Sequence, residues 1–183
     1  METLKVGLIA TGGRGHNGWQ AHQPEKGVTI VAGADIAPKA REEFKEKFPE
    51  ARIFEDYREL LKMDEIGAVF ISTPDYLHEE MAIDALKAGK AIYVEKPVGN
   101  SIPECHSMMD FQKKYKGVVT TGLWQTSQRY FLAANEILKS GVLGDVYKVQ
   151  LWLCQSTDPR PAVADSPVPS TLDYNMWLGP APE

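Results

Sequence analysis

Short apolar runs of strand length alternate with stretches of helical period throughout residues 1–123. This alternation is typical of βαβ units, in which parallel strands are covered by helices on both faces. The expected strands are residues 5–10, 28–34, a short run near 53, 68–72, 91–94 and 118–122. The expected helices are a short one before Pro24, then 38–48, 57–62, 77–88 and one opened by the Ser101-to-Glu104 capping pattern. The pattern therefore predicts the α/β class with a parallel sheet.

The pattern changes from Trp124 onward. A helix over 131–140 and an alternating strand over 146–153 are expected, followed by a proline-rich tail, 159–183, predicted to be loop. One helix and one strand cannot enclose a core, so residues 124–183 are predicted to be the incomplete start of a second domain after a first domain of 1–123. The unpaired strand edge predicts a homo-oligomer formed by strand addition, or aggregation.

Composition excludes several classes of function. The chain of 183 residues carries 20 basic and 25 acidic side chains, a formal charge of -5, which does not favour nucleic-acid binding. Cys105 and Cys154 lie far apart without a Cys/His cluster, so no metal site or disulfide is expected and a reducing cytoplasm is predicted. No apolar stretch is long enough to span a membrane, and no signal-peptide pattern precedes the first strand.

A glycine-rich loop directly follows the first strand. Such a loop between a strand and a helix lets the backbone approach a pyrophosphate, whose charge the amides at the helix start meet. Ala10 stands where the usual dinucleotide fingerprint has its first glycine. The candidate cofactor-binding residues of this loop are Thr11, Gly12, Gly13, Arg14 and Gly15. The alternative is an ordinary turn, with Arg14 on the surface.

Asp35 ends the second strand, where a carboxylate can accept hydrogen bonds from both ribose hydroxyls. Its charge would repel a 2′-phosphate, so NAD is expected over NADP. Lys39 and Arg41 follow closely and could weaken that preference. The alternative role for Asp35 is a helix cap.

Two further strands end in candidate site residues. Glu95 and Lys96 follow the fifth strand, at the edge where ligands of open α/β sheets bind. Lys96 is predicted to bind a substrate hydroxyl and move its proton, with Glu95 orienting it. Acid–base work by a lysine needs desolvation or a neighbouring cation, and a lysine in a surface salt bridge is the alternative. Thr73 and Pro74 are predicted to line the cofactor groove after the fourth strand.

His78 follows the Thr73-Pro74 turn. It is predicted to hold this turn by hydrogen bonds in preference to carrying a proton.

Together these motifs resemble the glucose-fructose oxidoreductase / inositol dehydrogenase (Gfo/Idh/MocA) family. The matching segments are the 11–15 loop, Thr73-Pro74-x-x-x-His78, Glu95-Lys96-Pro97, residues 122–130 and residues 141–146. The resemblance implies a doubly wound Rossmann NAD(P) domain, then an α/β domain on a mostly antiparallel sheet. It implies redox chemistry on a sugar, inositol or related polyol, with Lys96 as the catalytic lysine. Gln125, Arg129 and Tyr130 fall where such proteins meet nicotinamide or substrate, although capping and packing explain them too.

The chain departs from the family in one respect that concerns activity. Family members are longer, and their second domain carries an Asp-x-x-x-His pair that completes acid–base catalysis. The four histidines here, at 16, 22, 78 and 106, do not match that base. The chain is therefore expected to bind dinucleotide and to turn over sugars poorly or not at all.

Three functions stay open at this stage. The first is an NAD(P)-dependent oxidoreductase acting on a sugar or polyol, complete in a longer chain or with a partner. The second is a non-catalytic dinucleotide-binding module. The third is a glycosidase that oxidises its sugar transiently on tightly held NAD.

Overall fold

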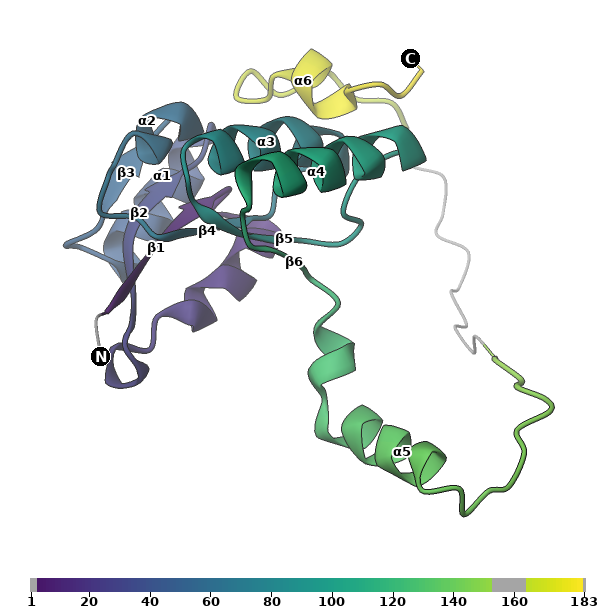
Figure 1. Ribbon diagram of the computed structural model, residues 1–183. Helices are drawn as coiled ribbons and strands as arrows, with labels where there is room; N and C mark the ends of the chain where they lie inside the picture. The colour runs from purple at the N-terminus through teal and green to yellow at the C-terminus, as the bar shows by residue number, and fades with distance from the viewer. Residues whose placement is uncertain (1–2, 153–163, 183) are drawn as a thin grey trace. The chain divides into compact units, whose positions relative to one another are not determined.

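The computed structural model describes residues 3–152 and 164–182, which fall into two compact units. The first unit contains the chain up to Gly122 together with the segment from Thr171, and the second is Leu123–Ser170. The first unit is built on one parallel sheet of six strands in the order β3-β2-β1-β4-β5-β6 (Figure 1). The strands are β1 (Leu4–Ile9), β2 (Val28–Ala34), β3 (Arg52–Phe54), β4 (Ala68–Ile71), β5 (Ala91–Val94) and β6 (Val119–Thr121).

This strand order confirms the predicted Rossmann fold, because the chain starts in the middle, winds outward to β3 and then crosses to β4 on the other side of β1. Strand β1 pairs in parallel with both β2 and β4. The two sides of the sheet therefore meet at the carboxyl end of β1, which is where this topology opens a crevice.

Helices cover both faces of the sheet, as the uninterrupted apolar strands require. On one face Val6 and Leu8 pack with Phe44 of α1 (Pro38–Lys47), next to the 3₁₀ helix η1 (Gly13–Ala21). On the other face Ile9 and Ile71 pack in a larger cluster with α2 (Tyr57–Leu61), α3 (His78–Lys87) and α4 (Ile102–Tyr115). Helices α3 and α4 lie side by side over the sheet (Figure 1). Shorter 3₁₀ turns are η2 (Pro24–Lys26) and η3 (Asp75–Leu77).

Two local predictions hold and one needs a correction. Ser101 caps α4 by accepting a hydrogen bond from the Glu104 amide at 3.4 Å, and the Glu104 carboxylate accepts one from the Asn100 amide at 2.7 Å. The bond to Ser101 is the first half of the predicted capping box, whereas Glu104 accepts from the amide one residue before the cap. Strand β2 has its predicted bounds. The helix after the glycine loop, in contrast, is a nine-residue 3₁₀ helix.

The second unit contains the 3₁₀ turn η4 (Trp124–Ser127) and helix α5 (Arg129–Lys139). The prediction of a strand over 146–153 is wrong for residues 146–152. Residues 146–152 have no strand structure, and residue 153 lies outside the described residues. A strand forms only when a neighbour pairs with its backbone groups, and the alternating side chains alone do not supply one.

The proline-rich tail also differs from its prediction. Helix α6 (Tyr174–Leu178) interrupts it, with the Asp173 carboxylate accepting a hydrogen bond from the Met176 amide at 3.0 Å. Residues from Thr171 group with the first unit, whereas the sequence assigned them to the second domain. Across residues 3–152 and 164–182, every helix is too short or too polar to cross a bilayer.

Candidate functional site

The carboxyl ends of the central strands are hydrogen-bonded to one another in a continuous row. The Ala10 amide donates to Ala34 O at 2.8 Å, the Ser72 amide to Ile9 O at 3.0 Å and the Glu95 amide to Ile71 O at 2.8 Å. The loops after β1, β2, β4 and β5 therefore leave the sheet at the same edge. This edge brings the predicted glycine loop, Asp35, the Thr73-Pro74 turn and the Lys96 segment together.

The glycine loop makes its turn through two residues in the left-handed region. Ala10 has φ +67° and Gly13 has φ +50°. Gly15 is required by close approach, because a methyl group there would lie 2.2 Å from the Ala10 carbonyl oxygen. Thr11 is fully buried and its hydroxyl donates to Ala40 O at 3.3 Å, so its side chain is not available to a ligand. Arg14 is exposed.

Asp35 shapes this loop as well as facing the crevice. Its Oδ2 accepts hydrogen bonds from the amides of Thr11 at 2.8 Å and Gly12 at 3.2 Å. Its Oδ1 accepts one from the Ala37 amide at 2.9 Å. One carboxylate thus joins the loop after β1 to the loop after β2, a link that the sequence did not predict.

The two cations near Asp35 are engaged elsewhere. Arg41 donates through Nη1 to the carbonyl oxygens of Asp35 and Ile36, at 2.8 and 2.9 Å, and pairs with Glu55 at 3.3 Å. Lys39 lies 3.8 Å from Glu43, one helical turn further along α1. Arg41 therefore supports the backbone of this loop, and Lys39 has a carboxylate partner of its own.

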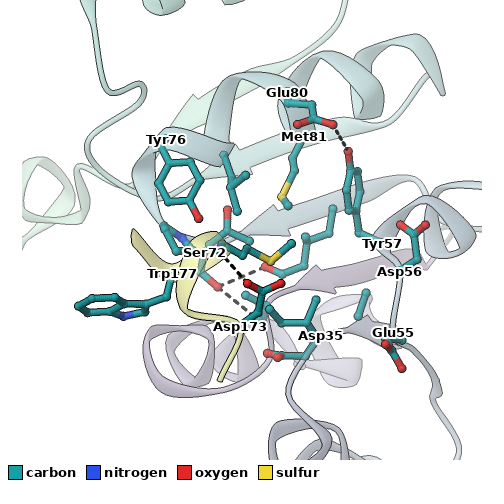
Figure 2. A pocket seen from close by; sticks show the side chains of 18 of the residues that line it. Asp35, Glu55, Asp56, Tyr57, Ser72, Tyr76, Glu80, Met81, Asp173 and Trp177 are labelled. Atoms are coloured by element: carbon teal, nitrogen blue, oxygen red, sulfur yellow. Dashed lines mark hydrogen bonds between the residues drawn. The ribbon is translucent and has the colours of Figure 1, made fainter. Parts of the chain in front are cut away.

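A cavity of about 540 Å³ opens at this edge of the sheet. Figure 2 shows Tyr76 and Trp177 on one side of it and Tyr57 and Glu55 on the other. Five carboxylates, together with a single arginine, are among its lining residues: Asp35, Glu55, Asp56, Glu80, Asp173 and Arg58. Arg58 pairs with Glu80, so the negative side chains predominate around the cavity. Of the predicted site residues, Asp35, Thr73 and Pro74 line it.

Two hydroxyl groups of the cavity wall are buried without a hydrogen-bond partner. They are Thr73 Oγ1 and the Tyr76 hydroxyl. Burial raises the pKa of Tyr76, and the nearby carboxylates of Asp173 and Asp75 raise it further, so this hydroxyl keeps its proton. Because a buried polar group without a partner costs free energy, both groups mark places where a bound molecule can supply hydrogen bonds.

Helix α6 supplies a wall of the cavity that the sequence did not predict. Leu172, Asp173, Met176 and Trp177 all line it. Gly179 ends the helix with φ +57°, and a methyl group there would lie 2.6 Å from the Tyr76 ring. Trp177 is 60% exposed at the cavity. The local signal for this helix was the Asp173 cap.

The remaining predicted residues lie beside the cavity or in the other unit. Lys96 is exposed at the end of β5, next to β4, while Glu95 is 7% exposed and accepts from the Lys96 amide at 3.1 Å. Gly122 allows β6 to approach Glu95, since a methyl group at that position would lie 3.1 Å from the Glu95 side chain. Gln125 belongs to η4 in the second unit, so its predicted cofactor role stays a prediction.

The topology, the glycine loop and the crevice define a nucleotide-binding protein of the Rossmann class. Residues 4–123 match the model of the Gfo/Idh/MocA oxidoreductase family, which has an NAD-binding Rossmann fold. The match covers more than half of the chain, and the chain belongs to this family.

Several relatives of known name are similar to the chain. An inositol 2-dehydrogenase from Gluconacetobacter diazotrophicus is 30% identical over 184 residues, covering 96% of this chain and 54% of that protein. An α-N-acetylgalactosaminidase from Shewanella oneidensis is 35% identical over 119 residues, covering 60% and 26%. The chain spans about half the length of the inositol dehydrogenases that it matches.

A solved structure shows the same fold. The scyllo-inositol dehydrogenase from Lactobacillus casei with bound NAD(H) and scyllo-inositol superposes with a TM-score of 0.74 at 23% identity. The superposition covers 79% of this chain and 43% of that one. This likeness confirms the predicted fold, and the match over residues 4–123 confirms the predicted family.

Proposed function

We propose that this chain is the cofactor-binding part of an NAD-dependent dehydrogenase that oxidises a sugar, inositol or related polyol. The observation that carries the proposal is the meeting of the glycine loop, Asp35, the Thr73 turn and the Lys96 segment at one sheet edge beside a cavity. Family membership and the inositol dehydrogenase relatives support the same reaction class.

The residues at this edge fit a dinucleotide. The backbone amides of Gly13 and Arg14 would meet the pyrophosphate, because those of Thr11 and Gly12 are bonded to Asp35 and that of Gly15 to Gly12 O. Asp35 would bind the adenosine ribose. The partnerless hydroxyls of Thr73 and Tyr76 would donate to or accept from the bound molecule. When bound, the nicotinamide ring supplies hydride acceptance or donation.

The surroundings of Asp35 favour NAD over NADP. A 2′-phosphate needs a free cation, whereas Arg41 is committed to two carbonyl oxygens and to Glu55. The excess of carboxylates around the cavity disfavours a further phosphate. The ribose hydroxyls of NAD, in contrast, are neutral donors that a carboxylate accepts.

Lys96 is proposed to bind the substrate hydroxyl and take its proton as the substrate is oxidised, with Glu95 orienting the segment. Both follow β5, and the Glu95 amide is fixed to the end of β4. Substrate oxidation would remove hydride from the ring carbon, and the hydroxyl proton would pass to the lysine nitrogen. The second acid–base group of the family would come from outside residues 1–123.

Calorimetric titration of the chain with NAD and NADP tests the cofactor part. NAD is expected to bind at least about tenfold more tightly than NADP, a difference of about 1.4 kcal/mol. Asp35→Asn should weaken NAD binding about tenfold or more by removing a charged acceptor. It should also reduce the preference for NAD over NADP. Asp64→Asn is the matched control, because this exposed aspartate precedes β4 at the opposite edge of the sheet. Equal affinity for both dinucleotides would contradict the assignment.

The catalytic part is tested by following NADH formation with inositols and sugars as substrates. Lys96→Ala is expected to abolish any turnover while leaving NAD affinity within about threefold, because the lysine acts on substrate. Turnover that Lys96→Ala leaves unchanged would contradict the role of Lys96.

A second candidate function is an NAD-dependent glycosidase, favoured by the 35% identity to the α-N-acetylgalactosaminidase. Such an enzyme would oxidise its sugar only transiently. Hydrolysis of a nitrophenyl N-acetylgalactosaminide without net NADH release would distinguish it from a dehydrogenase.

A further inference from the structure

His78 makes contacts that the proposed reaction does not use. It begins α3, and its side chain is almost fully buried at 1% exposure. Its Nδ1 lies 2.7 Å from Pro97 O, and its Nε2 lies 2.9 Å from Thr73 O. Pro97 follows β5 and Thr73 follows β4, so one imidazole ring bridges the two loops at the ends of these strands.

Both partners of His78 are carbonyl oxygens, which only accept. The ring therefore acts as a donor in this site, to one oxygen when neutral and to both when each ring nitrogen carries a hydrogen. An apolar side chain of similar volume would fill the space but leave two part-buried carbonyl groups without this donor. The role of His78 is thus polar as well as steric.

The bridge lies where the regular hydrogen bonding of the sheet stops. The bond from the Glu95 amide to Ile71 O ends the ladder between β4 and β5. Beyond it, within the described part of the chain, the His78 ring makes the hydrogen bonds between residues 73–77 and 96–98. Rotation or separation of these loops would therefore break contacts of one side chain.

The bridged loops carry residues of one half of the crevice. Thr73 directs its partnerless hydroxyl into the cavity wall, and Pro97 directly follows Lys96. Asp35 marks the adenosine half beyond β1, on the opposite side of the sheet order. A dinucleotide that spans the crevice from β2 places its other half at β4 and β5.

We propose that His78 is a positioning residue that holds the loops after β4 and β5 in the arrangement that binds the nicotinamide half of the cofactor. This inference rests on the proposed function. It predicts that loss of His78 affects ligands that contain nicotinamide more than ligands that lack it.

The test is calorimetric titration of the full 183-residue chain with NAD and with ADP-ribose, which lacks the nicotinamide ring. The wild-type chain is expected to bind NAD more tightly. His78→Ala should weaken NAD binding about tenfold while ADP-ribose stays within about threefold, so the preference disappears. His78→Gln, which keeps an N–H donor, should recover part of the preference. A purely structural residue would not show this ligand-specific rescue.

Met108→Ala is the control for a general loss of stability. Met108 lies in α4, is 3% exposed and is not itself a lining residue of the cavity. This variant should melt at a lower temperature and keep the wild-type preference for NAD. If it loses the preference as well, the positioning role of His78 is overturned.

The remaining outcomes separate the two proposals. If the wild-type chain binds neither ligand, the proposed function itself fails. If it binds both and His78→Ala keeps the preference, or weakens both ligands in proportion, only the role of His78 is refuted. A wild-type chain that binds NAD no more tightly than ADP-ribose would also refute the role of His78. Failure of both His78 variants to fold would refute it as well, because His78 would then be a core packing residue.

Discussion

Helices α3 and α5 have similar length and similar apolar patterning, but their surroundings differ. Helix α3 buries five apolar side chains against the sheet, Met81, Ala82, Ile83, Ala85 and Leu86. The large apolar side chains of α5 are 46–60% exposed. The apolar pattern alone is therefore enough to predict a helix. How much that helix stabilises the protein depends on what packs against its apolar face. We expect the first unit to carry most of the folding free energy.

The largest expected effect is that of Leu86→Ala in α3. Leu86 is 2% exposed and belongs to the larger core cluster. Removing its methyl groups should cost about 2–5 kcal/mol of unfolding free energy through lost burial and a cavity. Denaturant unfolding followed by circular dichroism measures this cost. A loss below about 1 kcal/mol would break the comparison, because the first unit would then not depend on its core.

A smaller effect is expected from Tyr57→Phe at the edge of the same core. Burial raises the pKa of Tyr57, as do the hydrogen bond to Asp84 at 2.9 Å and the carboxylates of Asp84 and Glu80. The net loss of the hydrogen bond should cost about 1 kcal/mol at neutral pH.

The pH dependence of the same variant sharpens the test. The folded state holds the hydroxyl proton of Tyr57 more tightly than the unfolded state, so the wild-type contribution is complete below about pH 10 and falls as the pH rises further. Tyr57→Phe should lose stability less steeply than wild type above that pH. Parallel stability curves for the two proteins would show that the hydroxyl is not buried as described.

Ala10→Gly should stabilise the first unit slightly. The left-handed backbone at φ +67° costs alanine about 1–2 kcal/mol, and glycine avoids this cost. The greater freedom of glycine in the unfolded chain reduces its advantage by about 0.4–1 kcal/mol. A net gain of about 0.5 kcal/mol is expected in thermal unfolding. A loss of stability would mean that the loop relaxes around alanine without strain.

The smallest effect is expected for Leu132→Ala in α5, the matched partner of Leu86→Ala. Leu132 is 50% exposed, and alanine is at least as good a helix former. The unfolding free energy of the first unit should change by less than about 0.5 kcal/mol. A loss comparable to that of Leu86→Ala would show that α5 is buried against a partner in solution.

Most of the first unit could be predicted from the sequence because its signals are local. The apolar run 28–34 and the Ser101 capping pattern each depend on neighbouring residues, and both appear in the structure. The predicted strand failed over its described residues, 146–152, because pairing depends on a partner strand, which an alternating pattern does not contain. Helix α6 was missed because prolines on both sides outweighed the cap at Asp173.

The candidate site was predictable as a set of positions at one sheet edge, because parallel strands deliver their ends there. The bonds that define it were not. Asp35 accepting from the glycine loop, Arg41 turned to the backbone and His78 bridging two loops are contacts across 5 to 24 positions of sequence. Such contacts arise from tertiary packing, and residue spacing does not encode them directly.

The chain leaves the first unit at Gly122 and rejoins it at Thr171. Everything between these points is an insertion anchored at both ends to one folded body. The entropic cost of closing such an insertion rises only slowly with its length. The intervening stretch is thus free to be exchanged or extended without rebuilding the sheet of the first unit.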